Sequence, residues 1–201
     1  MSASPHRAAT TSTTVRGLPI VVHNTRPDVA TVDVLRRLDE ALALIERYAP
    51  HHFRRLRRDF DRILVQRYAC RGAYLPEEHT CLVELTFTVN RDFTPSQIAA
   101  TILHEAMHAR LHRAGVPLEM ADRARQERFC RKAEIEFGKA VPDGARIVER
   151  ALAAHHAPDQ DVAPVIDPAL AESRIAEADR RALGTSSWLE RLIARRHRSA
   201  D

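Results

Sequence analysis

Aromatic residues are scarce in this chain, at 5% of its 201 residues, whereas alanine and leucine are plentiful. This composition favours helices that pack through small and aliphatic side chains. Cysteines are also few, and Cys70, Cys81 and Cys130 form an odd set without C-x-x-C spacing. Such a set fits neither a disulfide framework nor a thiolate zinc site, and it favours a reducing compartment.

Long apolar runs are absent too. Nowhere does the sequence reach the ~18 consecutive apolar residues that a membrane helix requires, and residues 1–16 lack the apolar core of a secretory signal. We therefore expect a cytoplasmic protein without a membrane partner. Neither sign of charge dominates, because 31 Lys and Arg are interspersed with 27 Asp and Glu. This mixture argues against nucleic acid as a partner. The sequence does not indicate whether the protein is a monomer or an oligomer.

Composition divides the chain into three parts. Residues 1–17 are rich in Ser, Thr and Ala without periodicity, which predicts a flexible tail. Residues 18–156 carry regular apolar patterns and are long enough for one domain. Prolines in residues 157–168 predict a linker, so residues 157–201 are expected to form a linker and a C-terminal helical extension, with helices over 169–183 and 186–196.

Within the central part, periodicity predicts mainly helices and a few strands, an α+β fold. Helices are expected over residues 32–48, 51–60, 118–140 and 145–155. Strands are expected over residues 18–23, 62–68 and 81–89, the last because apolar residues alternate from Cys81 to Val89. We expect the strands at 62 and 81 to be neighbours in one small antiparallel sheet, joined by a loop over residues 71–80.

The next helix has a strong start signal. Thr94 suits the N-cap, Pro95 the first helical position, and Gln97 the third residue of a capping box. The helix should run to about Ala114, because Gly115 and Pro117 follow. This helix is expected to pack beside the sheet.

The middle of this helix contains His104-Glu105-Ala106-Met107-His108. Residues four apart project from one face, so His104 and His108 can chelate one ion. Glu105 then lies beside the ion, where a general base belongs. The opposite face carries apolar residues, which favours burial over the alternative of two surface histidines on an amphipathic helix.

The strand CLVELTFTV followed by TPSQIAATILHEAMHARLH resembles the zincin metallopeptidases, over about residues 62–140. The glycine and third histidine of the metzincins are absent. A gluzincin-like plan remains, in which the following helix supplies a glutamate. The spacing H-E-x-x-H-x-x-x-H, completed by His112, is similar to the active helix of ImmA/IrrE-type peptidases. Arg131 stands where a gluzincin E-x-x-x-D would have aspartate.

Three glutamates on the following helix compete as the third ligand, namely Glu127, Glu134 and Glu136. Glu127 lies 19 residues after His108, close to the gluzincin separation, and shares a helix face with Glu134, whereas Glu136 points elsewhere. We favour Glu127 and keep Glu134 as the alternative. His112, another turn along, is expected to have an outer or surface role.

The resemblance implies a zinc-dependent metallopeptidase that hydrolyses a peptide or protein substrate. Zn²⁺ would be held by His104, His108 and Glu127, with a fourth position open for water and Glu105 as the proton acceptor. The substrate would pair with the edge of strand 81–89, and Tyr74 and His79 are either oxyanion donors or exposed loop residues.

Two other functions stay open. One is a non-catalytic zinc-binding or regulatory protein that keeps the zincin fold. The other is a helical nucleic-acid-binding module that uses an arginine-rich helix. Asp59 and Asp61 are expected to offset the charge of that helix, whose arginines are Arg54, Arg55, Arg57 and Arg58.

Overall fold

The computed structural model describes residues 9–117, 122–162, 170, 173 and 175–177. The chain divides into two compact units, Met1–Val165 and Ile166–Asp201. In the second unit every described residue is helical. The rest of the helices predicted over 169–183 and 186–196 lies outside the described residues. No helix in the described part of the chain is long and apolar enough to cross a membrane.

The first unit has an α+β fold in which helices dominate, as the sequence predicts. Its sheet contains the strands β1 (Ala9–Val15), β2 (Leu18–Asn24), β3 (Arg62–Gln66), β4 (Gly72–Leu75) and β5 (Thr80–Glu84). Its helices are α1 (Thr31–Tyr48), α2 (Pro50–Asp59), α3 (Leu85–Val89), α4 (Pro95–Arg113), α5 (Arg123–Ala140), α6 (Ala145–His156) and α7 (Asp159–Val162), with a 3₁₀ turn η1 (Pro76–Glu78). Helix α7 lies within the residues predicted as a linker.

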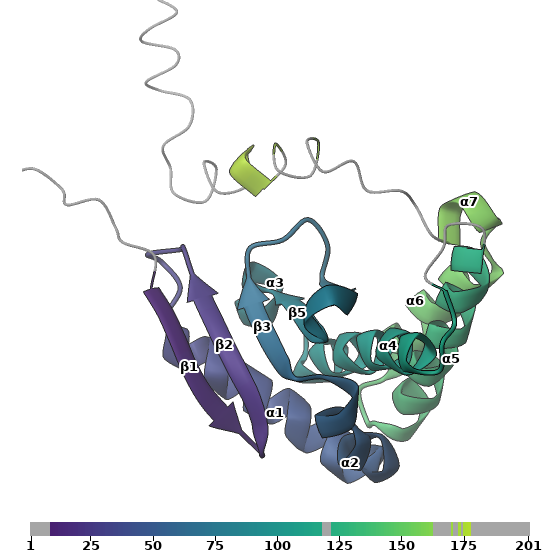
Figure 1. Ribbon diagram of the computed structural model, residues 1–201, viewed down its shortest axis with the longest axis horizontal. Coiled ribbons are helices and arrows are strands. Elements are labelled where there is room, and N and C mark those ends of the chain that lie inside the picture. The colour runs from purple at the N-terminus through teal and green to yellow at the C-terminus, as the bar shows by residue number, and fades with distance from the viewer. Residues whose placement is uncertain (1–8, 118–121, 163–169, 171–172, 174, 178–201) are drawn as a thin grey trace, which may run out of the picture. The chain divides into compact units, whose positions relative to one another are not determined.

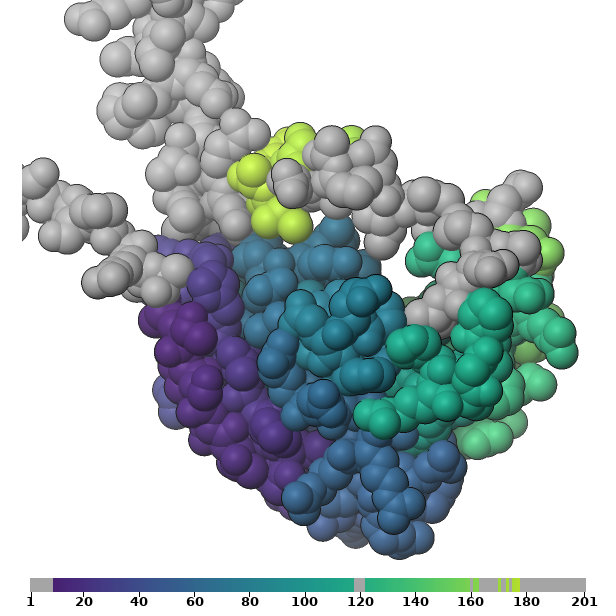
Figure 2. All heavy atoms as spheres, in the orientation of Figure 1, coloured from purple at the N-terminus to yellow at the C-terminus, as the bar shows by residue number. Residues whose placement is uncertain are grey.

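The first strand corrects the prediction of a flexible tail over residues 1–17. β1 pairs antiparallel with β2, from Ala9 opposite Asn24 to Val15 opposite Leu18. Arg16 and Gly17 connect the strands, and both have positive φ, 48° and 79°, as a type I′ hairpin turn requires. Backbone pairing rather than apolar burial holds β1, which is why its mostly exposed sequence lacks a strand pattern. Figure 2 shows β1 at the outer margin of the surface.

The direction of the sheet is also different from the prediction. Its strand order is β1-β2-β3-β5-β4, and the inner pairs β2·β3 and β3·β5 are parallel. Only the outer pairs β1·β2 and β4·β5 are antiparallel. The prediction of a small antiparallel sheet is therefore wrong, because the sheet is mixed. Residues 67–79 are long enough for a crossover between parallel strands, and they contain β4 and η1 instead of a plain loop.

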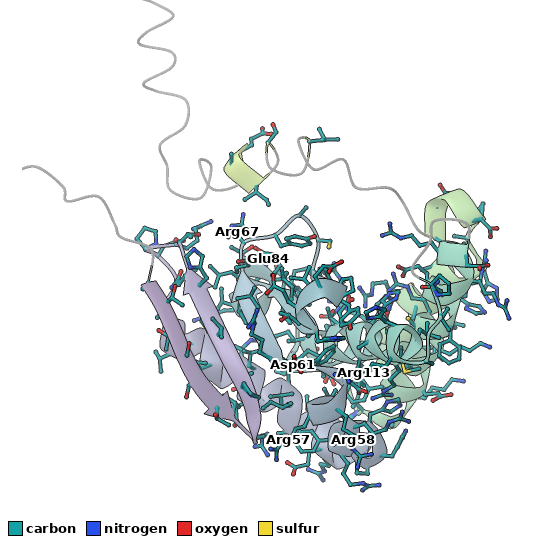
Figure 3. All side chains as sticks on the ribbon, viewed as in Figure 1. Arg57, Arg58, Asp61, Arg67, Glu84 and Arg113 are labelled. Carbon is teal, nitrogen blue, oxygen red and sulfur yellow. The ribbon has the colours of Figure 1, made fainter. Side chains whose placement is uncertain are left out.

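The strand predicted over residues 81–89 ends early. β5 stops at Glu84, whose carboxylate accepts a hydrogen bond from the Phe87 amide (2.6 Å) and thereby caps α3. Arg67 from the end of β3 forms an ion pair with the same carboxylate. Figure 3 shows Arg67 and Glu84 side by side. The apolar alternation continues through residues 85–89, but this capping interaction turns the backbone into a helix.

Helix α4 lies at the centre of the first unit. It contacts α1, α2, β4 and β5, and on another side it contacts α5, which in turn packs on α6 (Figure 1). Its start matches the prediction, because the Thr94 amide donates to the Gln97 Oε1 at 2.9 Å. Ile98, Ile102 and Ala106 are fully buried in the apolar core. This packing fixes the His104 to His108 turn between the sheet and α5.

The Glu84 cap generates a stability prediction. Replacing Glu84 by alanine removes the cap of α3 and one partner of an ion pair whose side chains are only 11% and 7% exposed. We expect the free energy of unfolding to fall by about 3 kcal/mol, because the largely buried side chain of Arg67 loses its carboxylate partner. Urea denaturation measures the change.

A matched control is Glu78→Ala. Glu78 pairs with Arg62, but these side chains are 50% and 40% exposed, so the loss should stay below ~1 kcal/mol. Equal losses in the two variants would contradict the role of burial and capping at Glu84.

Candidate metal centre

Three potential ligands converge between α4 and α5. The Nε2 atoms of His104 and His108 are 3.1 Å apart. The Glu127 carboxylate lies 3.1 Å from His104 Nε2 and 3.4 Å from His108 Nε2. The two histidines come from successive turns of α4, and the glutamate from the first turns of α5.

These separations fit a metal ion. Nitrogen and oxygen ligands bound to zinc at ~2.0–2.1 Å in a tetrahedral arrangement lie roughly 3.3 Å apart. The separations of 3.1, 3.1 and 3.4 Å are close to this value, with Glu127 Oε2 next to His104 and Oε1 next to His108. The donor set of two imidazoles and one carboxylate is also one that zinc accepts. The residues are thus able to hold such an ion without moving apart.

Glu134 has a different position from Glu127. Its Oε1 lies 2.6 Å from the Nδ1 of His104, on the far side of the ring from the other ligands. Arg131 (2.5 Å) and Arg150 (2.7 Å) bind the same carboxylate. A proton on Nδ1 is therefore donated to Glu134, which leaves Nε2 of His104 available for an ion. The arrangement makes Glu134 a group that orients His104, whereas Glu136 is exposed.

In the metal-free protein a proton occupies this cluster. Burial would lower the pKa of His104, but hydrogen bonds with Glu127 and Glu134 outweigh it and raise the pKa to about 10. Burial would raise the pKa of Glu127, yet hydrogen bonds with the two histidines hold it well below its ordinary value. Burial would also raise the pKa of Glu134, but its hydrogen bond with His104 outweighs burial and lowers the pKa to about 2. The surroundings therefore favour a cation at this place.

Glu105 is buried and faces the sheet. A Cβ atom on Gly72 of β4 would lie 3.1 Å from its Oε1. Burial raises the pKa of Glu105, although the neighbouring histidines oppose this shift. A raised pKa makes a carboxylate a stronger proton acceptor.

Cys130 is a residue of this site that the sequence reasoning missed. The potential ligand atoms of His104, His108 and Cys130 all lie within 4.8 Å of one another. Cys130 follows Glu127 by three residues on α5 and is fully buried. The signal was present as an E-x-x-C spacing, because residues three apart share a helix face. The sequence also places Cys130 on the helix face of Glu127 and Glu134, but it was not predicted to be a ligand because the cysteines lack C-x-x-C spacing.

The strand proposed to bind substrate is misassigned. β5 lies between β3 and β4 and is buried along its whole length, so it has no free edge. The outer strand on this side is β4, which contacts α4. A strand at the end of a sheet is the one that presents unpaired backbone groups.

A second polar cluster lies one turn beyond His108. The Tyr74 hydroxyl is 3.0 Å from the Nδ1 of His79 and 3.0 Å from the Nδ1 of His112. One hydroxyl donates only one hydrogen, so it accepts from one ring and donates to the other. His79 has φ 44°, in the left-handed region. All three residues are half-buried; Tyr74 lies on β4 and His112 on α4, whereas His79 lies in the turn before β5.

Helix α2 exposes the arginine-rich face named above, made of Arg54, Arg55, Arg57 and Arg58. The prediction that Asp59 offsets this charge is wrong. Asp59 is buried and is bound by Arg110 of α4 at 2.6 Å. Asp61 lies 4.0 Å from Arg113 (Figure 3), so it too faces an arginine outside α2.

Gly72 gives a test of the contact between β4 and α4. A Cβ atom there would lie 2.5 Å from Thr101 Cγ2, so Gly72→Ala should destabilise the fold by about 1–3 kcal/mol through overpacking. Thr101→Ser removes that Cγ2 but keeps the hydroxyl that donates to the Gln97 carbonyl at 3.1 Å. In the Thr101→Ser background the same glycine substitution should cost less, as urea denaturation will show. An equal cost in both backgrounds would contradict this contact.

The pH dependence of the metal-free protein follows from His104. Its folded pKa, about 10, is above the ordinary value of 6.5. Its stabilising contribution is therefore complete below pH 6.5 and is lost as pH rises towards 10. Between pH 6.5 and 8.5 we expect the free energy of unfolding to fall by up to ~1.4 kcal/mol per pH unit, measured by urea denaturation at each pH.

Saturating zinc is the control for this prediction. Because an ion at Nε2 replaces the proton of His104, the fall in stability across this pH window should be smaller in the zinc-loaded protein. The same slope with and without zinc would show that the proton lies elsewhere.

Comparisons with known proteins leave the family of this chain open. No family model, curated protein or solved structure matches it. The zincin resemblance therefore stays a prediction, and the interpretation of the site depends on the motif and on its geometry.

Proposed function

We propose that this protein is a zinc-dependent metallopeptidase with a gluzincin-like plan. The observation that supports this most is the convergence of His104, His108 and Glu127 at separations of 3.1–3.4 Å. Two histidines and a glutamate form a ligand set of catalytic zinc sites. Three protein ligands leave one position for water, whereas structural sites use four.

The roles of the side chains follow from their positions. A bound zinc ion would supply Lewis acidity and would lower the pKa of a water molecule to about 7. Glu105 would take the proton of that water and later return it to the leaving amine. Glu134 would keep His104 in the required tautomer, with Arg131 and Arg150 holding Glu134 in place.

The substrate we propose is an extended segment of a peptide or protein. β4 can pair with such a segment through its outer edge, because backbone groups at a sheet edge accept an added strand. Gly72 places β4 next to Glu105, so a paired segment would pass close to the general base. Tyr74, on the same strand, could donate its hydroxyl hydrogen to a substrate carbonyl in place of the histidine ring that now accepts it.

Substitutions in two glutamates separate metal binding from hydrolysis. Glu105→Gln should keep zinc binding but lower kcat/KM by roughly 10²–10⁴-fold, the range for loss of general-base catalysis. Glu127→Gln should lower zinc affinity by more than the ~10–100-fold that loss of an outer partner costs. Zinc content by elemental analysis and cleavage of a mixture of unstructured peptides, followed by mass spectrometry, give the two readouts.

Glu136→Gln is the control, because Glu136 is an exposed carboxylate on the same helix. It should change neither zinc content nor cleavage. A native protein that binds zinc but cleaves no peptide would favour the alternative of a non-catalytic zinc protein. A native protein that binds no zinc, but binds DNA in a salt-dependent manner, would favour the arginine-rich α2 as its functional surface.

A further inference from the structure

We propose that Cys130 is a fourth metal ligand that exchanges with solvent, so that the metal centre has a closed state in which its thiolate occupies the open position. This inference depends on the metal site of the proposed function. It adds a device that regulates that site, because an ion with four protein ligands has no place for water.

The spacing of Glu127 and Cys130 along α5 suits a pair of metal ligands. Glu127 and Cys130 are three residues apart and therefore share a helix face. A pair of ligands at this spacing can project inward from one helix onto a metal, as the Glu-x-x-His pairs of helical bundles do. His104 and His108, four apart on α4, form the opposing pair. The two helices thus contribute one pair each.

The Cys130 sulfur also lies close to the two histidines. The ligand atoms of His104, His108 and Cys130 lie within 4.8 Å of one another. Sulfur at ~2.3 Å and nitrogen at ~2.0–2.1 Å from one tetrahedral zinc would lie roughly 3.6 Å apart. The difference of about 1 Å is within reach of a change in the χ1 rotamer of the cysteine. The thiol is therefore beside the ligand position and able to enter it.

The surroundings of the Cys130 thiol differ from those of the other two cysteines. Cys130 is fully buried, and its sulfur lies within 4.8 Å of a ligand atom of each histidine. Cys70, by comparison, donates to the Gly72 carbonyl at 2.9 Å. Cys81 lies on β5 within the sheet. Neither belongs to the group of potential ligands, which sets Cys130 apart from the other two thiols.

The charges around the site favour an anionic fourth ligand. The buried carboxylates of Glu105, Glu127 and Glu134 carry three negative charges when ionised, and Arg131 and Arg150 balance two of them. A divalent ion beside neutral His104 and His108 leaves one positive charge in excess. An anionic ligand restores neutrality, and hydroxide and the Cys130 thiolate are the two candidates within this site. On ligation the thiol gives its proton to solvent, and its sulfur takes the place of solvent at the ion.

Cobalt(II) is a direct probe, because thiolate ligation to this ion produces an intense charge-transfer absorption in the near ultraviolet. We expect the metal-free full-length protein, titrated with cobalt(II), to develop this band together with the visible bands of a four-coordinate ion. Cys130→Ser should lose the near-ultraviolet band while it keeps bound cobalt. Cys70→Ser and Cys81→Ser, the matched controls, should keep the band.

The outcomes are distinguishable. Cobalt bound by the native protein without the near-ultraviolet band would overturn the role of Cys130 and leave the proposed peptidase site intact. The same band persisting in Cys130→Ser would also overturn it, because another thiol would then be the ligand. Absence of any bound cobalt or zinc would overturn both proposals. The native spectrum alone decides whether a thiolate binds, so the test does not depend on the folding of the Cys130 variant.

Discussion

The buried carboxylate of Glu134 is the interaction on which the rest of the candidate metal centre depends. Its side chain is 0% exposed, and an ionised carboxylate in such a place costs several kcal/mol unless it is paired. Three contacts of 2.5–2.7 Å pair it, to His104, Arg131 and Arg150. These partners lie on α4, α5 and α6, so one carboxylate fixes the relative positions of three helices. The tautomer of His104 and the approach of Glu127 both follow from that packing.

Much of the helical frame could be predicted because its signals are local. The start of α4 is encoded by Pro95 and Gln97 within one turn, and the structure has the predicted hydrogen bond to the Thr94 amide. Helix geometry alone predicts that His104 and His108 lie on the same face of α4. The burial of the opposite face follows from its apolar residues. A pattern confined to one helix can therefore be interpreted without knowledge of the rest of the chain.

The parts that could not be predicted depend on contacts between distant segments. Glu127 and Glu134 share one face of α5, so spacing alone leaves both as candidate ligands. Arg150 binds the Glu134 carboxylate from another helix, 16 residues further along the chain. This contact helps to hold Glu134 at the Nδ1 side of His104, away from the other ligands. The end of β5 is a similar case, because Glu84 caps α3 while it pairs with Arg67, the residue that follows the neighbouring strand β3. The parallel direction of the inner strands likewise follows from pairing and not from any strand's own pattern.

The candidate site occupies two faces of α4, one that packs on α5 and one that packs on the outer strand β4. Consecutive residues on a helix are ~100° apart, so His104 and Glu105 cannot face the same neighbour. His104 faces α5, where Glu127 and Glu134 lie, whereas Glu105 faces Gly72 on β4. Helix pairing thus positions the groups that would hold an ion, and the sheet positions the group that would move a proton. Because β4 is outermost in the sheet, the same strand that supports Glu105 also has an edge at which an extended chain can pair. If the proposed function is correct, a substitution that displaces β4 would impair the general base while the helices would still bind metal.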